Sequence, residues 1–428
     1  MGDAPGRTEG DLETGRASGA GSDDVERIAD WIGGSASPSP STVRPNRKRR
    51  PHVLLLSTMD TKAEEVGYAV AALAANGVAT RVHDVSLKTG GKRLVGNEKL
   101  RAMQRTAHDI IHGIGPLLGP HYRAIFGIGG GTGGQIIIDV MRALPFSYPK
   151  VLVSPLPFDP RDHVADTSIV IVPALADLCG LNATLRQVLD NAAAMVAGIC
   201  ANTRPPVHVS DEPSIGITAL GSTHAGVDAL VRMVREAGRE ATVFHSNGYG
   251  GAAFARWCES GAFEGTVDYT THEITRLHVT GAHTSMPHRF TAPAQAGIPS
   301  VVLPGGMNFI GLGGQAFVPR SLLARPHYRH SALFTHVKVS EDEMRLCAGA
   351  LATELLRARG DTRVMVPMGG FSSEDRAGGA IEDQTLREVF LDTIREELAD
   401  RIPIQAIDAH INDAACARAA LDAVLERL

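Results

Sequence analysis

The sequence predicts an α/β protein built from two doubly wound parallel sheets. Two observations lead to this fold class. Short, continuous apolar runs alternate with Ala-rich stretches of helical periodicity, and the alternation stops in a Pro-rich segment and then restarts. The composition agrees, because 43% of the residues are hydrophobic and the 46 glycines and 24 prolines supply many tight turns. With 428 residues, the chain is long enough for two or three domains.

The N-terminal segment, residues 1–50, is rich in Gly, Ser, Pro and acidic residues. Such a stretch buries too little apolar surface to offset its ordering entropy, so we predict a disordered extension. Trp31 and Ile32 offer a short docking helix as an alternative for part of it. The basic cluster RPNRKRR at 44–50 either contacts phosphates or forms a solvated junction, and we favour the junction.

The first domain is predicted over residues 51–205. It opens with PHVLLLS (51–57), an apolar run typical of a buried parallel strand. A helix pattern follows, with acidic residues in its first turn and Gly77 at its end. The later elements are a strand at 78–85, a helix near 97–118, a strand at 123–129, the helix QIIIDVMRAL, the strand KVLVSPL and a helix at 181–202. This βαβαβ order predicts a doubly wound, Rossmann-like sheet, and the Pro-rich segment 203–213 is the predicted linker.

The second domain is predicted over residues 206–428, where the same alternation resumes. Its predicted elements are the strand SIGITALG, the helix AGVDALVRMVREAG, the strand EATVFHS, the helix AAFARWCESG, strands at 266–270, 299–303 and 363–367, and helices at 340–359, 384–400 and 413–428. The rhythm again predicts a parallel α/β sheet, although no sequence repeat links the two halves.

Charge and composition narrow the function classes. The formal net charge is −5 with acidic and basic residues nearly balanced, which gives no electrostatic reason to expect nucleic acid or an anionic membrane as partner. No apolar run approaches the roughly 20 residues that span a bilayer, and the N-terminus lacks the apolar core of a signal peptide. The five cysteines form no CxxC pair. We therefore expect a cytoplasmic protein.

The first candidate site follows the first predicted strand. In open parallel α/β sheets, ligands bind outside the carboxyl ends of the strands. The segment STMDTKAEE leaves that strand and enters a helix. The hydroxyls of Thr58 and Thr61, the charge of Lys62 and exposed helix N–H groups suit phosphate oxygens, and Asp60 could hold Mg²⁺ or a ribose hydroxyl. The alternative is that Asp60 or Thr61 only caps the helix while Lys62 is solvated.

The second candidate segment, GIGGGTGGQ (127–135), also lies between a strand and a helix. Its small residues let the backbone approach a phosphate closely and adopt positive φ. The match to GxGxxG is weak by itself, and the segment lacks the GK[ST] of a Walker loop. A purely structural turn is the alternative. The predicted phosphate-binding residues here are Gly129, Gly130, Gly131, Thr132, Gly133 and Gly134.

Five loops of the second domain also follow strand-like runs. They combine glycines with Ser, Thr, Asn and His, a composition that suits a polar pocket for an anion or a sugar-like molecule. Each loop singly is also compatible with ordinary turn chemistry. The loops are GSTHAG (221–226), HSNGYGG (245–251), TTHE (270–273), PGGMNF (304–309) and MGGFSSED (368–375). The predicted substrate-binding residues are Gly248, Gly250, Gly251, Thr271, Asn308, Gly369 and Gly370.

Histidines supply the acid–base candidates. The cluster from His272 to His288 and the cluster from His327 to His336 do not match HExxH or a zinc-finger spacing, so we predict no metal site there. His272 and Glu273 are adjacent and would point in opposite directions on a strand. In DAHIND (408–413) a histidine stands just before the last helix, where a plain N-cap is the alternative. The predicted catalytic residues are Thr223, His245, Glu273 and His410.

Eight motifs, in order, resemble the Tm-1-like ATP-binding family, also called the UPF0261 family. They are STMDTKAEE, GIGGGTGG, ALADLCGLN, VFHSNGYGG, DYTTHE, PGGMNF, PMGGFSSED and HINDAACA, and they extend from about residue 51 to the C-terminus. The resemblance implies an ATP-binding Rossmann-like domain, a second α/β domain and assembly as a homodimer or higher homo-oligomer. By motif, it places the nucleotide at Thr58, Asp60, Thr61, Lys62 and the glycines from Gly129 to Gly134.

Two segments depart from the family pattern. SPLPFDPRDH follows the strand that ends near Val153, where relatives carry small polar residues. His272 stands in TTHE where a third threonine is commoner. The first difference is expected to alter one wall of the nucleotide pocket, and the second to mark a specialised substrate.

The leading hypothesis is an enzyme that uses ATP and Mg²⁺ to act on a small acidic or hydroxylated metabolite. Phosphoryl or adenylyl transfer, including ligation, requires mainly positioning and charge neutralisation, which Gly-rich loops supply. One alternative is a nucleotide-gated module that binds a partner protein. Another is a lyase or hydrolase that works from the second domain without nucleotide, using His410 with Glu273.

Overall fold

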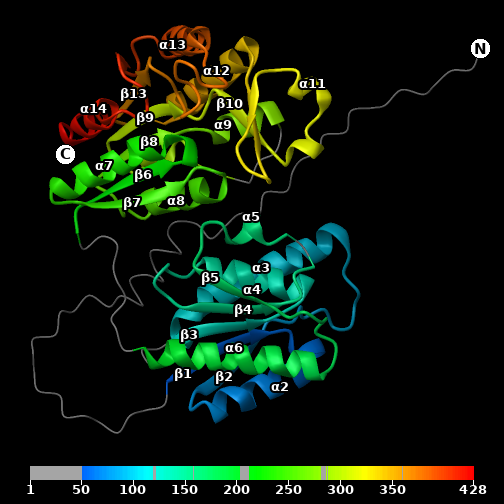
Figure 1. The fold of residues 1–428 in the computed structure, drawn as a ribbon. Coiled ribbons are helices and arrows are strands. Elements are labelled where there is room, and N and C mark those ends of the chain that lie inside the picture. Colours follow the sequence, from blue (N-terminus) through cyan, green and yellow to red (C-terminus); the bar gives the residue numbers. More distant parts are fainter. Residues whose placement is uncertain are drawn as a thin grey trace, which may run out of the picture. The chain divides into compact units, whose positions relative to one another are not determined.

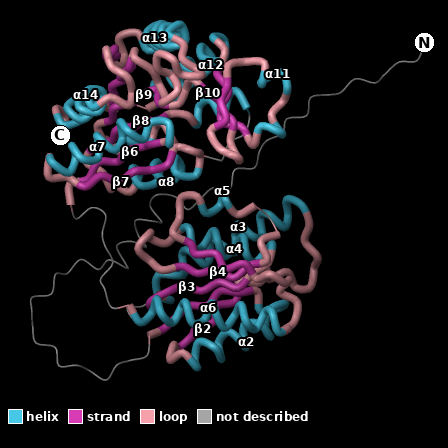
Figure 2. The backbone as a smooth tube through the Cα atoms, viewed as in Figure 1, coloured by secondary structure: helices cyan, strands magenta, loops and turns pink. Residues whose placement is uncertain are grey.

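The computed structural model describes residues 51–118, 122–157, 159–202, 212–280, 286, 288–358 and 360–428. The predicted extension at 1–50 and most of the predicted linker lie outside these residues. The chain divides into two compact units, Met1–Pro160 with Thr167–Pro206 and Arg161–Asp166 with Val207–Leu428. Each unit holds a parallel sheet between helices (Figures 1 and 2), which confirms the predicted α/β fold class.

The first unit contains a five-stranded parallel sheet in the order β2-β1-β3-β4-β5. The strands are β1 (His52–Ser57), β2 (Ala79–Asp84), β3 (Tyr122–Ile128), β4 (Lys150–Ser154) and β5 (Ile169–Pro173). In register, Ser57 is level with Asp84 on one side and Ile128 on the other. The carboxyl ends of β1, β2 and β3 therefore reach the same edge of the sheet.

Helices cover both faces of this sheet. α2 (Met59–Ala75) packs with α6 (Ala183–Ala201), and α3 (Gly96–Leu117) packs with α4 (Gly131–Arg142). The spacing of Val66, Ala69 and Leu73 puts one apolar stripe of α2 into the core, as amphipathic periodicity requires. Because both faces are covered, the interior strands are apolar without alternation: β1 is buried from Val53 to Leu56.

The second unit contains a six-stranded parallel sheet in the order β14-β13-β9-β8-β6-β7. The strands are β6 (Ser214–Ala219), β7 (Glu240–His245), β8 (Gly265–Thr270), β9 (Ser300–Gly305), β13 (Thr362–Pro367) and β14 (Ile404–Ile407). Numbered within its own unit and read from β7, this order is 2-1-3-4-5-6, and the first sheet is 2-1-3-4-5. The two units therefore share one topology despite the absence of a visible sequence repeat.

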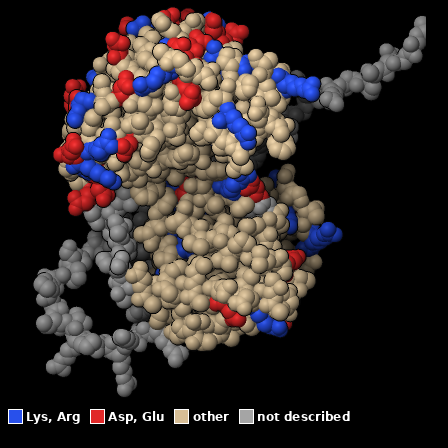
Figure 3. Space-filling model, viewed as in Figure 1, with Lys and Arg blue, Asp and Glu red and all other residues tan. Residues whose placement is uncertain are grey.

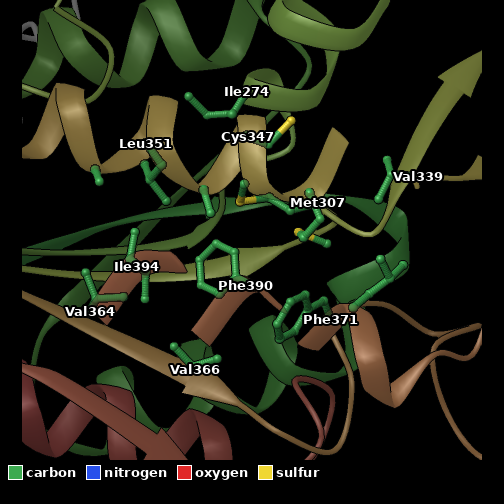
Figure 4. Close-up of a cluster of buried hydrophobic side chains, with 14 of the residues drawn as sticks. Ile274, Met307, Val339, Cys347, Leu351, Val364, Val366, Phe371, Phe390 and Ile394 are labelled. Atoms are coloured by element: carbon green, nitrogen blue, oxygen red, sulfur yellow. The ribbon is translucent and has the colours of Figure 1, made fainter. Parts of the chain in front are cut away.

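Helices also cover both faces of the second sheet. α7 (His224–Glu236) and α14 (Ala414–Leu425) pack together on one face, and the opposite face is covered by α8 (Tyr249–Glu259), α10 (Ala292–Gln295), α12 (Glu341–Arg357) and α13 (Gln384–Leu398). Figure 4 shows the core between α12, α13 and the sheet, where Leu351, Phe390 and Ile394 meet Val364 and Val366 of β13. Successive side chains of β13 point to opposite faces of the sheet. Val364 and Val366 therefore face α12 and α13, whereas Met365 faces α7 and α14.

Several short elements complete the fold. They are α5 (Arg161–Val164), η1 (Gly221–Thr223), α9 (Glu273–Thr275), η2 (Arg276–Thr280), η3 (Gln315–Phe317), α11 (Arg320–Leu323) and an antiparallel sheet β10-β12-β11 formed by Phe309–Leu312, Thr335–Lys338 and His327–Arg329. The sequence did not predict β5, β14 or this antiparallel sheet, because three to five residues show too little periodicity.

The TTHE segment follows its strand as predicted, because β8 ends at Thr270 and Glu273 opens the short α9. One local prediction was wrong. The Gly-rich segment was predicted to precede its helix, but α4 begins at Gly131, so part of the segment forms the first helical turn. Glycines and threonines are poor helix formers in isolation, and packing overrides that preference here.

Surface charge is mixed in sign. In the view of Figure 3, Lys and Arg side chains are interspersed with Asp and Glu side chains on the second unit. None of the described helices has both the length and the apolar character needed to cross a membrane. The mixed surface charge agrees with the near balance of acidic and basic residues in the sequence.

Candidate functional site

The first candidate site lies where the order of the first sheet reverses. From β1 the chain crosses to β2 on one side, whereas from β3 it proceeds to β4 and β5 on the other side. The loops that follow β1 and β3 therefore diverge at the carboxyl edge. Open α/β sheets bind ligands at this topological switch point. The two segments predicted from sequence, 58–62 and 129–134, are the loops that meet there.

Close backbone packing explains the glycines of the second segment. Ser57 of β1 donates to the Ile128 carbonyl of β3 at 2.7 Å, which ties the two strand ends together. A Cβ at Gly129 would lie 2.6 Å from the Gly134 nitrogen, and one at Gly133 would lie 3.0 Å from Cγ2 of Thr58. A side chain at Gly129 would collide with the backbone of its own segment, and one at Gly133 would press on Thr58 of the first segment, so the packing requires glycine at both positions.

The first turn of α4 leaves backbone donors free. Its N-cap residue is Gly130, which has no side chain to cap the helix. No described residue accepts a hydrogen bond from the amides of Gly131, Thr132 or Gly133. Unpaired amides and the positive end of the helix dipole together favour an anion at this position.

The first turn of α2 differs, because side chains from β2 and from the loop after it already accept hydrogen bonds from its backbone amides. The Met59 amide donates to Asp84 Oδ1 at 3.0 Å, and the Asp60 amide donates to Ser86 Oγ at 3.3 Å. Burial by itself raises the pKa of Asp84, but the hydrogen bonds from Ser86 and Met59 outweigh burial and hold that pKa below its ordinary value. The start of α2 is thus less available to an anion than the start of α4.

The predicted side chains at the start of α2 have distinct positions. Thr58 is the N-cap residue, so Asp60 and Thr61 lie within the helix and neither is its N-cap. The hydroxyls of Thr58 and Thr61 are 3.1 Å apart, and Asp60 is exposed. Lys62 has non-helical backbone angles, and its ammonium donates to the Leu178 carbonyl in the loop after β5.

That loop, residues 174–182, is a part of the edge to which the sequence assigned no role. Buried Glu65 of α2 accepts a hydrogen bond from the Gly180 amide at 2.9 Å. Together with Lys62 this contact fixes the loop to α2. The same rule that identified the other segments, residues directly after a strand, points to this loop and to Ser86 once β2 and β5 are known.

The second unit repeats the arrangement, with its switch point between β6 and β8. The loops after β6, β7, β8, β9, β13 and β14 all lie at the carboxyl edge of the second sheet, as the sequence predicted for five of them. Figure 1 shows β6, β7, β8, β9 and β13 side by side in this unit. Hydrogen bonds across this edge decide which side chains remain available.

The threonines of this edge are engaged in the fold. Thr223 Oγ1 lies 3.0 Å from Thr270 Oγ1 and accepts a hydrogen bond from the Leu220 amide at 3.0 Å. Thr271 donates to the Leu303 carbonyl at 3.1 Å. All three threonines are buried. Their bonds join the loops to one another, which is a positioning role.

Glu273 belongs to a buried charged network. Arg289 binds Asp268 through two hydrogen bonds of 2.7 and 2.8 Å and lies 3.4 Å from Glu273 Oε2. Ser246 also contacts that carboxylate oxygen. Burial by itself lowers the pKa of Arg289, but the two carboxylates more than offset it, so this pKa lies above its ordinary value. One cation therefore neutralises two carboxylates inside the unit.

His272 presents one free ring nitrogen. Its Nδ1 lies 2.8 Å from the Gly306 carbonyl, which can only accept, so Nδ1 carries the proton and Nε2 is left as an acceptor. Burial lowers the pKa of His272 to about 4. Its ring packs at a tilt of 30° against Phe309, whose ring stacks on His336. His272 is therefore a neutral acceptor near neutral pH.

His410 is held at both ring nitrogens. Nε2 donates to the Ser372 carbonyl at 2.9 Å, and Nδ1 accepts from Arg376 at 2.7 Å and from the Asn412 amide at 3.0 Å. Burial and then the charge of Arg376 lower the pKa of His410. Asp413 is the N-cap residue of α14, but its carboxylate binds the His410 amide rather than capping the helix. His245, by contrast, is exposed at the end of β7.

The predicted substrate-binding glycines are explained by close packing and by backbone conformation. A Cβ at Gly250 would lie 2.2 Å from the His245 carbonyl, and one at Gly251 would lie 2.4 Å from Glu273 Oε1. Gly248 has φ of 100°, a left-handed value that favours glycine. Gly369 and Gly370 likewise have backbone atoms within 3 Å of an added Cβ.

Asn308 is different from these glycines, because it retains an unused polar atom. Its Nδ2 donates to Ser372 Oγ at 3.0 Å, while its buried Oδ1 has no hydrogen-bond partner within the described part of the chain. Among the described residues, no group of three or more His, Cys, Asp or Glu side chains is placed to hold a metal ion.

Comparisons with family models and with known sequences identify the same family along most of the chain. The model of the uncharacterised protein family UPF0261 matches in two parts, its N-terminal domain at residues 90–205 and its C-terminal domain at 212–428. A UPF0261 protein of Mesorhizobium japonicum is 30% identical over 389 residues, covering 86% of this chain and 97% of that protein. One of Rhizobium meliloti is 30% identical over 396 residues, covering 87% and 98%.

More distant matches were also found. The ToMV resistance protein Tm-1 of Solanum lycopersicum is 28% identical over 309 residues, which is 71% of this chain but 41% of that protein. Among solved structures, LpCGTa in complex with UDP aligns over 88% of this chain and 99% of that chain with 10% identity and a TM-score of 0.19. A score that low supports no argument about fold or ligand.

Proposed function

This chain belongs to the UPF0261 family, and we propose that its first unit binds ATP at the switch point between β1 and β3. The observation that carries the proposal is the start of α4. Three backbone amides, those of Gly131, Thr132 and Gly133, have no partner among the described residues and stand where two loops diverge. This combination of free donors and positive helix end suits the phosphates of a nucleotide.

The residues of this edge fit a triphosphate. The amides of Gly131, Thr132 and Gly133 would hold phosphate oxygens, and the hydroxyls of Thr58 and Thr61 lie beside them, since Gly133 abuts Thr58. Asp60, exposed at the start of α2, would hold Mg²⁺. Lys62 would act indirectly, because its ammonium is bound to the loop after β5. ATP would supply a transferable phosphoryl or adenylyl group.

We propose further that the second unit holds the acceptor, a small acidic or hydroxylated metabolite. The support is the second switch point, between β6 and β8, with the exposed His245, the free Nε2 of His272 and the unpaired Oδ1 of Asn308 at its edge. His272 Nε2 and Asn308 Oδ1 accept hydrogen bonds, so they favour a ligand that donates them, such as a hydroxylated compound. Homo-oligomeric assembly, which the family resemblance implies, stays a prediction.

A second function is favoured by one observation. The polar atoms of Thr223, Glu273 and His410, three of the four predicted catalytic residues, are occupied by hydrogen bonds within the fold. Such residues position loops rather than perform proton transfer. This favours a nucleotide-gated module that binds a partner protein without turnover.

Titration calorimetry with ATP and Mg²⁺ tests the central proposal. Gly131→Val is the informative variant, because an added Cβ would lie 3.5 Å from Pro157, an ordinary contact, while the larger side chain would cover the free amides. Gly67→Ala is the matched control, since it lies in α2 with open space around its Cα. We expect at least a tenfold loss of affinity in Gly131→Val and none in Gly67→Ala.

Two results would decide against the proposals. If the wild-type protein binds no ATP, the nucleotide site is refuted. If it binds ATP but consumes none with a panel of hydroxylated and acidic metabolites, the transferase is refuted and the binding module is retained.

A further inference from the structure

Leu175 has an unusual backbone for an apolar residue. Its φ is +61°, in the left-handed region that favours glycine. The Ala176 amide donates to the Ala174 carbonyl at 2.7 Å, so Leu175 is the central residue of a γ-turn. A γ-turn with positive φ at its centre is rare and strained, and a side chain at that position adds to the cost.

The side chain of Leu175 is not buried in return for this strain, because 81% of it is exposed. Its neighbours in the loop are held firmly. The Leu178 carbonyl binds Lys62, and the Gly180 amide binds buried Glu65. The fold therefore fixes a loop that presents an aliphatic side chain to solvent, an arrangement that core packing does not explain.

A second leucine, half-buried, has the same left-handed backbone after the neighbouring strand. Leu156 follows β4 and has φ of +51°, with its amide bonded to Ser154 Oγ at 3.2 Å. Leu175 follows β5, which pairs with β4. Both leucines therefore lie at the carboxyl edge, on the same side of the switch point as β3.

The distance along the carboxyl edge, from the start of α4 to the loop after β5, suits the separation between the phosphates and the base of one nucleotide. The sheet order places β4 and β5 next to β3, and neighbouring strands are about 4.8 Å apart. Pro157, beside Leu156, is 3.5 Å from a Cβ added at Gly131, so the loop after β4 reaches the start of α4. The edge thus runs from the free amides at the start of α4, past the half-buried Leu156, to the exposed side chain of Leu175.

We propose that Leu175, with Leu156, forms an apolar platform for the nucleobase of the nucleotide whose phosphates are bound at the start of α4. This inference rests on the proposed ATP site. The flat face of a base buries apolar surface against an aliphatic side chain, so the platform favours a ligand with a base over inorganic polyphosphate. The strained turn is what keeps the Leu175 side chain out of the core and available for this contact.

The test compares two probes, ATP and inorganic tripolyphosphate, both with Mg²⁺, by titration calorimetry. Leu175→Ala keeps the backbone strain and removes most of the apolar side chain. We expect about a tenfold loss of ATP affinity and unchanged tripolyphosphate affinity. Met195→Ala is the control, because Met195 is also exposed but lies far along α6 from its N-terminus.

Leu175→Gly separates binding from folding. Glycine relieves the left-handed strain, so the thermal midpoint should rise while ATP affinity falls. Equal ATP affinity in wild type and both Leu175 variants would overturn the platform, as would an equal loss for ATP and tripolyphosphate. If the wild-type protein binds neither probe, the ATP site fails and the platform fails with it; binding of both probes with no effect at Leu175 refutes the platform alone.

Discussion

Replacing Arg289 by methionine is expected to destabilise the second unit strongly. The guanidinium is buried and binds Asp268 through two hydrogen bonds, with Glu273 at 3.4 Å. Methionine fills similar volume but leaves two buried carboxyl groups without a cation. Removing one partner of a buried ion pair costs about 3–5 kcal/mol, because the remaining charge is uncompensated.

Urea unfolding followed by tryptophan fluorescence measures this penalty for the second unit. The sequence has two tryptophans, and Trp257 packs against Phe244 and Phe263 in that unit. A Trp31→Phe background leaves Trp257 as the single reporter. Arg232→Met is the control, because Arg232 forms an exposed pair with Asp228 on α7 and should cost about 0.5 kcal/mol or less.

Two results would refute this reasoning. A cost below about 1 kcal/mol at pH 7 would mean that the buried carboxyl groups find other partners. A cost equal to that of Arg232→Met would mean that burial of the Arg289 ion pair adds nothing to its contribution.

Two further predictions concern the second unit. Burial holds the pKa of His272 at about 4, below the ordinary value near 6.5, so the unfolded state binds the proton more readily. Stability should fall by up to about 3 kcal/mol as pH drops from 6.5 to 4, and His272→Asn, which retains a donor for the Gly306 carbonyl, should lose that dependence in unfolding curves. Gly370→Ala should cost more than about 2 kcal/mol in urea unfolding, because φ is 136° and the added Cβ would lie 1.8 Å from the Asp375 carbonyl. Gly349→Ala in α12, where the space is open, should instead gain up to about 1 kcal/mol; similar effects of the two substitutions would contradict the geometry.

The sequence predicted well which loops lie at the carboxyl edges of the two sheets, because parallel α/β folds obey a simple rule. A residue directly after a buried strand reaches the carboxyl edge, whichever strands pair. The segments at 58–62 and 129–134, and the five loops of the second unit, were found in this way and lie where predicted. The loop at 174–182 was named only as a family motif, since β5 is too short to be predicted, and Ser86 was given no role although the strand before it was predicted.

The sequence did not show which of these side chains are held by hydrogen bonds within the fold. Lys62 was predicted to supply positive charge to a phosphate site, yet its ammonium binds the Leu178 carbonyl, 116 positions away in the chain. His410 was a candidate acid–base group, yet both its ring nitrogens are held by Ser372, Arg376 and Asn412. Partners of this kind are set by which loops meet, and long-range contacts leave no local pattern.

By itself the sequence determined the fold class, the positions of the longer strands and helices, and the loops at the sheet edges, because hydrophobic periodicity and turn residues are local properties. Only the tertiary structure decided the strand order, and with it the switch points beside β1 and β6. It also decided which donors remain free at Gly131 to Gly133 and that Leu175 is held exposed. Strand pairing and hydrogen-bond partners are chosen by packing between distant segments, so they exist only once the chain has folded.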